Sequence, residues 1–290
     1  MMYGTKELFE YYQCQNCGTI QIKEIPSNLK NYYPENYHKS KYAFLNKILQ
    51  YLRWKRDEYS FNGKGLLGNV LQYYIGKNYN TKAFHRLTKK ISFDKNSVKI
   101  LDIGCGNGGF VYFLHKLGYK NVLGIDPFIE NKSWNQTVRL EQKTVSNLNE
   151  TFDLIISNHS LEHVTDIVND FKQIFKLLNE GGIFFLRIPV VGWGYDVYKE
   201  NWVQLDAPRH INIPSLEGIE AICAKTNLSI VEYFYDTTEL LFVGSELYKK
   251  ELSLKNKNIF TKKEIRLFYK KADKLNQENK GDQICVIIRK

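Results

Sequence analysis

The pattern of apolar and polar residues predicts an α/β protein, because apolar runs of strand length alternate with helical patterns through the middle of the chain. Four short apolar runs are typical of strands buried on both faces of a parallel sheet, at residues 99–103, 122–125, 152–157 and 183–188. Between the first two runs, apolar residues recur on one face of a predicted helix that Gly118 ends. The best-marked helix spans residues 166–178 and is followed by paired glycines.

Helices are also predicted before this core. Apolar residues at helical spacing begin at Phe44 and Leu45, and a second helical segment follows around 79–91. We therefore divide the first third of the chain into an N-terminal extension at 1–40 and a helical region at 41–95.

The remainder, residues 96–290, is predicted to form one domain. Its second half holds a helix at 216–225, a strand at 230–235, a basic helical insertion at about 236–280 and a last strand. Residues 131–150 are expected to hold a helix and a strand, although neither is well marked. Residues 190–215 read as a long loop rich in glycine and aromatic side chains, a composition typical of loops that carry function.

A glycine cluster stands between the first predicted strand and its helix, at Gly104, Gly106, Gly108 and Gly109. Glycines let the backbone turn tightly and let a ligand approach it closely. Asp126 ends the second strand, where a carboxylate can accept both hydroxyls of a ribose. A strand, a glycine turn, a helix and a strand ending in an acid form the plan of a nucleotide-type cofactor site.

The glycine spacing alone does not separate a dinucleotide from another adenosine cofactor, since it also fits G-x-G-x-x-G. Asp102 favours one of them. Its carboxylate would repel a pyrophosphate but attract a cationic ligand. S-adenosylmethionine carries an ammonium and a sulfonium and no phosphate, so the sequence favours this cofactor over a dinucleotide.

Four segments now carry a resemblance to a known family: LDIGCGNG, GIDP, FDLIISNHSLEHV and LLNEGGIFFLRIP. In this order and spacing, over residues 98–189, they resemble the class I S-adenosylmethionine-dependent methyltransferases. The resemblance implies a Rossmann-like sheet of seven strands with helices on both faces, and helices before the first strand that form a lid. Cofactor binding is assigned to Asp102, Gly104, Cys105, Gly106, Gly109, Asp126, Pro127, Asn158 and His159.

Cys14 and Cys17 form a C-x-x-C turn in the extension. A structural zinc needs four ligands, and beyond His38 as a third we find no fourth nearby, so two ordinary cysteines in a tight turn are favoured and no metal is assigned. The five cysteines are scattered and odd in number, which indicates a reducing compartment. With no secretory pattern and no membrane-length apolar run, the sequence predicts a cytoplasmic protein without a membrane partner.

The formal net charge is +10, from 41 Lys and Arg against 31 Asp and Glu. Because the lysines are spread along the chain, a simple lysine-rich composition is the first interpretation. Attraction to a phosphorylated small substrate is the second, and nucleic-acid binding is ranked below both.

Methyl transfer needs an acceptor about 3 Å from the methyl group and a base that removes its proton. The segment LDAPRHINIPS resembles one found in methyltransferases encoded with bacterial surface-polysaccharide genes. In sugar C-methyltransferases with a zinc-binding N-terminal region, the equivalent loop supplies a histidine base. His210 matches it here, with His163 as the second candidate. Arg209 is expected to bind a phosphate or carboxylate of the substrate, or else to fix its own loop to Asp206.

Aromatic side chains of the same loop, Trp193 and Tyr195, are expected to contact the substrate. The predicted function is methyl transfer from S-adenosylmethionine to a small polar acceptor, at oxygen, in capsule or lipopolysaccharide biosynthesis. The acceptor would be a sugar, a nucleotide-sugar or a phosphorylated modifier. The alternatives are a nucleic-acid or protein methyltransferase, a non-catalytic cofactor-binding protein of the same fold and, last, a dinucleotide oxidoreductase.

Overall fold

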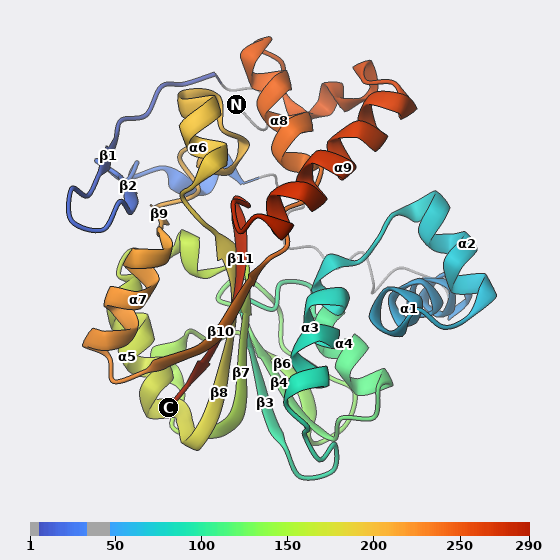
Figure 1. Ribbon diagram of the computed structural model, residues 1–290. Coiled ribbons are helices and arrows are strands. Elements are labelled where there is room, and N and C mark those ends of the chain that lie inside the picture. The colour runs from blue at the N-terminus through green and yellow to red at the C-terminus, as the bar shows by residue number, and fades with distance from the viewer. Residues whose placement is uncertain (1–5, 34–46) are drawn as a thin grey trace. The chain divides into compact units, whose positions relative to one another are not determined.

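The structure is a computed structural model that describes residues 6–33 and 47–290 (Figure 1). Two compact units divide the chain. The first consists of Met1–Pro34, His159–Phe171 and Leu186–Val286, and the second of Glu35–Asn158, Lys172–Phe185 and Ile287–Lys290. Each is described by itself below.

Parallel strands form the centre of the second unit, as their continuous apolar runs predict. The strands are β3 (Lys99–Ile103), β4 (Asn121–Ile125), β6 (Val138–Glu141) and β7 (Phe152–Asn158). β3 pairs in parallel with β4 and β7, so that Asp102 lies opposite Gly124 on one side and Ile156 on the other. The short strand β5 (Lys132–Ser133) pairs antiparallel with β6.

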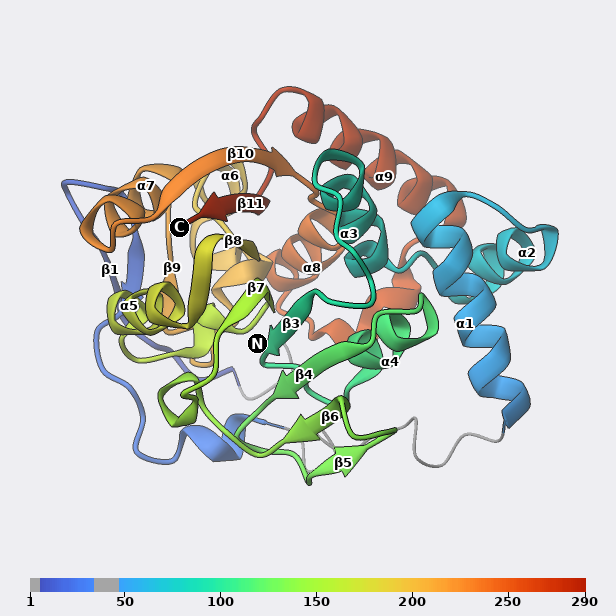
Figure 2. The same ribbon diagram turned by 90° about the horizontal axis from the view of Figure 1, so that it is seen from below.

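The complete sheet has eight strands in the order β10-β11-β8-β7-β3-β4-β6-β5. Its other members are β8 (Leu178–Pro189), β10 (Ser229–Tyr235) and β11 (Gln283–Arg289). α4 (Gly109–Lys116) and α5 (Ile167–Leu177) cover opposite faces of the sheet (Figure 2). The Rossmann-like α/β fold is confirmed, and β5 is an edge strand beyond the seven that the sequence predicts.

The helical region before β3 contains α1 (Lys47–Asn62), α2 (Leu66–Ile75) and α3 (Tyr79–Lys90). Its residues 41–46, with Phe44 and Leu45, lie outside the described part of the chain. Aromatic rings join α1 and α3 to α4. Phe61 of α1 lies 5.7 Å from Phe113, and Phe84 of α3 lies 5.6 Å from Phe110, centroid to centroid. These contacts fix α1 and α3 to the helix that follows the glycine turn, and the action of the helical region as a lid stays a prediction.

Two details of this core differ from the sequence prediction. No α-helix forms between residues 131 and 150, which hold β5, β6 and a single 3₁₀ turn (Val145–Asn147). α5 ends at Leu177 and β8 begins at once, five residues before the predicted strand. The glycine pair therefore does not end the helix. Gly181 takes a left-handed φ of 72° within β8, and the Gly182 carbonyl accepts the Lys290 N–H at 3.1 Å, which extends the strand pairing.

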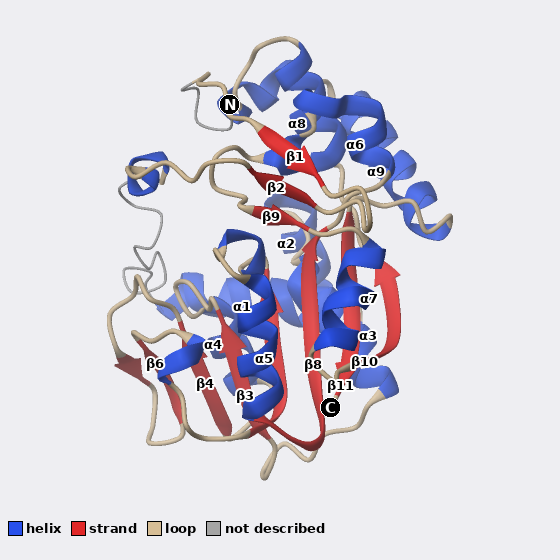
Figure 3. Ribbon diagram, turned by 90° about the vertical axis from the view of Figure 1, so that its left-hand side faces the viewer, coloured by secondary structure: helices blue, strands red, loops and turns tan. Residues whose placement is uncertain are grey.

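A small antiparallel sheet organises the first unit. β1 (Tyr11–Gln13) pairs with β2 (Ile20–Ile22), and β2 pairs with β9 (Asn212–Ile213), as Figure 3 shows. The Ser215 hydroxyl continues this connection by donating to the Cys17 carbonyl oxygen, while it also accepts the Gly218 N–H and so caps α7 (Leu216–Lys225). The predicted N-terminal extension is thus folded onto a segment nearly two hundred residues away in the sequence.

The stretch after Pro189, predicted as a loop, contains the short helix α6 (Trp193–Tyr198). It packs against α8 (Leu240–Lys249) and α9 (Lys262–Gln277), two helices that lie within the predicted basic insertion. Trp202 is fully buried in this cluster and donates its Nε1–H to Asp282 at 3.0 Å. Over both described ranges, no helix has the length and apolar character needed to span a bilayer.

Candidate active site

The glycine turn between β3 and α4 has the backbone conformation that the sequence predicts. Gly104, Gly106 and Gly108 have φ angles of 68°, 52° and 74°, in the left-handed region that glycine adopts without strain. The Gly104 and Cys105 N–H groups both donate to the Ile125 carbonyl, at 2.8 and 3.0 Å. The turn is therefore hydrogen-bonded to the end of β4, beside Asp126, the residue predicted to bind the ribose.

Two glycines of this turn provide a matched pair of variants. A Cβ at Gly108 would lie 2.4 Å from a methyl carbon of Leu140, whereas a Cβ at Gly106 would meet no atom within 4 Å. Both substitutions incur the left-handed cost of about 1–2 kcal/mol, and only Gly108→Ala adds overpacking of about 1–3 kcal/mol. We expect Gly108→Ala to lower the free energy of unfolding in urea clearly more than Gly106→Ala. Equal losses would contradict this account.

Asp126 is fixed next to the turn by two backbone donors. Its Oδ2 accepts the Gly106 N–H at 3.1 Å and its Oδ1 accepts the Phe128 N–H at 2.9 Å, while 7% of the residue is exposed. Pro127 follows it and is exposed. The structure thus brings together Gly106 and Asp126, as expected of a site that holds a ribose.

Asp102 lies in the interior at the end of β3, with 3% of its surface exposed. Burial, and then the charge of Asp126, raise its pKa to about 8. Burial also raises the pKa of the neighbouring Cys105 thiol, which stays protonated. An acid in this environment gains most from a cationic partner, because such a partner restores its charged form.

Asn158, the last residue of β7, has a buried side-chain oxygen without a hydrogen-bond partner among the residues that the structure describes. A buried amide oxygen of this kind is available to a ligand donor. It belongs to the same unit as Asp102, the glycine turn and Asp126. His159 follows it with a left-handed φ of 51°.

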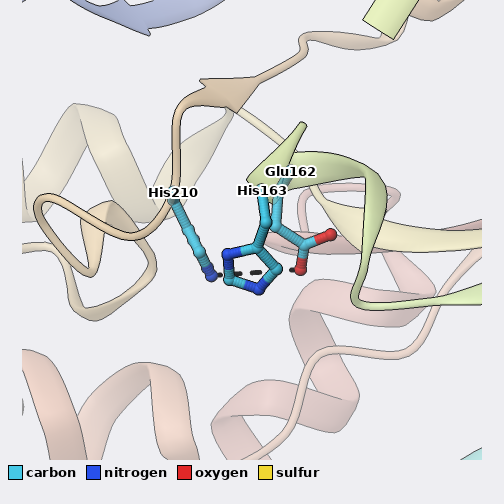
Figure 4. Close-up of side chains that lie close together, drawn as sticks. All are labelled: Glu162, His163 and His210. Atoms are coloured by element: carbon cyan, nitrogen blue, oxygen red, sulfur yellow. Dashed lines mark ion pairs between the residues drawn. The ribbon is translucent and has the colours of Figure 1, made fainter. Parts of the chain in front are cut away.

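A second cluster lies within the first unit, where the 3₁₀ turn of Leu161–His163 packs beside residues 209–212. The Ile211 N–H donates to the Glu162 carbonyl at 2.7 Å, and the Asn212 amide donates to the Val164 carbonyl at 2.6 Å. These bonds bring Glu162 and His163 next to His210 (Figure 4), with their ligand atoms within 4.8 Å of one another.

The orientation of both histidines is fixed through Nδ1. His163 Nδ1 lies 2.8 Å from the Arg209 carbonyl oxygen, and His210 Nδ1 lies 2.6 Å from the Gln204 carbonyl oxygen. A carbonyl oxygen only accepts, so each Nδ1 carries the proton and each Nε2 keeps a lone pair. His210 Nε2 lies 3.9 Å from Glu162 Oε1, which is also 3.1 Å from His159 Nδ1.

The charges in this cluster are set by burial and by the neighbouring rings. Burial raises the pKa of Glu162, but the hydrogen bond from His159 and the three nearby histidines outweigh it, and the pKa falls to about 2. Burial and His163 lower the pKa of His210 to about 3. A histidine with so low a pKa is a poor general base at neutral pH. Proton removal by His210 itself stays a prediction that these electrostatics do not favour.

Arg209 forms an ion pair with Asp206, and both side chains are buried. Its guanidinium also lies over the Tyr33 ring, 5.5 Å from the centroid, while the Tyr33 hydroxyl is 3.5 Å from His163 Nδ1. These contacts fit the alternative in which Arg209 fixes its own loop to Asp206. Its predicted role in binding substrate is left to experiment.

The two aromatic residues expected at the substrate belong to α6. Trp193 lies 5.9 Å from Phe242 and Tyr195 lies 5.9 Å from Trp202, centroid to centroid. Both therefore contribute to packing in the first unit, and their contact with substrate stays a prediction.

Cys14 and Cys17 form a tight turn in which the Gly18 N–H donates to the Cys14 carbonyl at 2.8 Å. Backbone N–H groups of Cys17 and Asn16 lower the pKa of Cys14. Within residues 6–33 and 47–290 the turn is not joined by a third metal-ligating side chain, and His38 lies outside the described residues.

Comparison with known proteins gives the family. Residues 74–233, more than half of the chain, match the family model described as a methyltransferase domain. The chain belongs to this family. The cofactor of this methyltransferase is S-adenosylmethionine, as Asp102, the glycine turn and Asp126 predict.

Curated relatives are similar to this methyltransferase over parts of their length. The mitochondrial ubiquinone biosynthesis O-methyltransferase of Bos taurus is 34% identical over 121 residues, which cover 37% of this chain and 31% of the relative. The tRNA U34 carboxymethyltransferase of Campylobacter hominis is 30% identical over 128 residues, which cover 40% and 45%. The methyltransferase therefore spans about a third to a half of the length of these relatives.

Among solved structures, this methyltransferase is similar to a putative sarcosine dimethylglycine methyltransferase from Galdieria sulphuraria, with a TM-score of 0.51 and 13% identity. The similarity covers 82% of this chain and 98% of that one, and it shows the fold alone.

Proposed function

We propose that this methyltransferase transfers a methyl group from S-adenosylmethionine to a hydroxyl oxygen of a small polar acceptor. The acceptor would be a sugar, a nucleotide-sugar or a phosphorylated modifier, in capsule or lipopolysaccharide biosynthesis. The carrying observation is the cluster of Glu162, His163 and His210, in which Glu162 and His210 are buried and His163 is half-buried. In the chain it begins four residues after Asn158, the last residue of a strand whose carboxyl end is where sheets of this type bind their ligands.

The chemistry suits an oxygen acceptor. A hydroxyl attacks the methyl carbon of the sulfonium, the carbon–sulfur bond breaks with its electron pair left on sulfur, and the hydroxyl proton must leave. The anionic Glu162 carboxylate and the two oriented imidazoles would accept hydrogen bonds from that hydroxyl and so polarise it. The O-methyltransferase name of the bovine relative agrees with the proposed acceptor atom, although neither curated relative named above is a polysaccharide enzyme.

A transfer RNA acceptor is the second candidate. The net charge of +10 and the tRNA-modifying relative from Campylobacter hominis favour it. A small-molecule acceptor does not require either feature.

The test is to incubate the protein with S-adenosylmethionine labelled in the methyl group and, separately, with free sugars, nucleotide-sugars, sugar phosphates and bulk tRNA. We expect label in a small-molecule acceptor as an alkali-stable methyl ether, with loss of transfer in Glu162→Gln. Label in tRNA alone would reject the small-molecule proposal. Label attached to nitrogen or carbon would reject the assignment to oxygen.

A further inference from the structure

We propose that Glu162, His163 and His210 bind a divalent transition-metal cation of the Zn²⁺ type. The cation would act at the acceptor hydroxyl, so this role rests on the proposed function, whereas the site itself does not. One carboxylate and two imidazoles are a ligand set typical of such metals. Mg²⁺ and Ca²⁺ prefer oxygen donors throughout.

The three ligand atoms lie close together in the structure. One atom from each residue is within 4.8 Å of the others, and all three residues belong to the first unit. The turn of Leu161–His163 supplies two ligands and the segment before β9 supplies the third, with backbone hydrogen bonds between them. The arrangement is therefore built into the fold of this unit.

The outer contacts are those of metal-binding histidines. A ligating histidine donates its other ring N–H to a carbonyl or carboxylate, which sets the tautomer and aims the free nitrogen. His163 and His210 both do so through Nδ1, to the carbonyls of Arg209 and Gln204. Each is left with Nε2 as the ligand atom.

The carboxylate provides the independent observation. Glu162 is fully buried, and its Oε2 has no hydrogen-bond partner among the described residues. A buried carboxylate oxygen without a partner is costly and demands an explanation. A cation bound to Oε1, the oxygen that lies 3.9 Å from His210 Nε2 (Figure 4), would balance the buried negative charge that the two oxygens of Glu162 share.

A metal with three protein ligands keeps an open position. The acceptor hydroxyl can bind there, and the cation lowers its pKa so that the proton passes to solvent water before the oxygen attacks the methyl carbon. His163 and His210 then act by holding the metal, and both must be neutral to do so. Neither ring is the proton acceptor in this scheme.

The test is a calorimetric titration of the full chain with ZnCl₂ after chelator treatment, in a Cys14→Ser/Cys17→Ser background that removes the thiols. We expect one zinc site per chain. We expect the zinc affinity to fall by about 100-fold or more in Glu162→Gln and His210→Ala, since the loss of a residue that only hydrogen-bonds a metal ligand already lowers affinity by about 10–100-fold. His115→Ala, in α4, is the matched control and should bind like the background protein. Co²⁺ should give visible absorption bands that vanish in the same two variants.

Folding is checked separately by S-adenosylhomocysteine binding, whose ligands Asp102 and Asp126 belong to the other unit. The metal site would be overturned if the background protein bound no zinc. It would also be overturned if Glu162→Gln and His210→Ala both bound S-adenosylhomocysteine and kept the zinc affinity of the background protein. Full methyl transfer by the metal-free protein would overturn the metal's role and leave the proposed function standing. Zinc binding without transfer to any hydroxyl acceptor supports the site and rejects the proposed function.

Discussion

The Asp126→Ala variant is expected to bind S-adenosylhomocysteine about 100-fold or more weakly than the unchanged protein. A carboxylate that accepts two ribose hydroxyls makes hydrogen bonds worth about 1.5–3 kcal/mol each, and the substitution removes both. It also removes the acceptor of the Gly106 and Phe128 N–H groups, so the turn itself loosens. Isothermal titration calorimetry measures the change.

Two further variants separate these contributions. Asp126→Asn keeps an acceptor for one backbone N–H but cannot accept from both hydroxyls, so an intermediate loss is expected. Glu130→Ala removes the same charge from an exposed position four residues later and should leave the affinity unchanged. NADH should give no heat of binding. An Asp126→Ala protein that binds S-adenosylhomocysteine normally would refute the assignment of Asp126.

Asp102→Asn is expected to make the cofactor-free protein more stable while it weakens cofactor binding. The pKa of Asp102 is raised to about 8, so the folded state holds a proton that the unfolded state releases near pH 4. The stability of the free protein therefore falls as the pH rises from about 4 to about 8 and changes no further above that. Asparagine removes this penalty, which amounts to about 1.4 kcal/mol per unit of pKa shift.

Thermal unfolding at pH 5 and pH 9 tests this sign. We expect the gain in melting temperature of Asp102→Asn to be larger at pH 9, and Glu130→Gln to show no such difference. At pH 7 the unchanged protein should release a proton when S-adenosylhomocysteine binds, because the ligand ammonium restores the Asp102 carboxylate. A stability gain that is independent of pH, or undiminished affinity, would count against the buried acid as the ammonium partner.

The conformation of the glycine turn and its neighbours could be predicted because their signals are local. The strand, the glycine turn, the helix and Asp126 lie within thirty residues, and each position has its own physical requirement: left-handed φ at the glycines, a buried apolar run, an acid at the end of a strand. The structure differs here only in small elements. β5 adds an edge strand. Residues 131–150 form no α-helix, because asparagine side chains such as those of Asn135 and Asn147 accept hydrogen bonds from nearby backbone N–H groups in turns.

The histidine cluster could be predicted only in part. The sequence singles out His163 and His210 separately, but their contact depends on hydrogen bonds across 46 residues, which no local pattern encodes. Nothing in the sequence around Glu162 shows that one of its carboxylate oxygens is buried without a hydrogen-bond partner. Its position four residues after the carboxyl end of β7, where sheets of this type bind ligands, is the signal that could have found it. Tyr33 gives none.

The small sheet of β1, β2 and β9 also has a consequence for the synthesis of the protein. Tyr11 donates its hydroxyl to the carbonyl of His210, 199 residues further along the chain, and β2 finds its second partner only in β9. Paired strands of three residues are not stable alone in water. At about 5–20 residues per second, a ribosome leaves them waiting for about 10–40 seconds. The histidine cluster is thus completed late, and during that interval the N-terminal strand edges stay unpaired and open to contact with other chains.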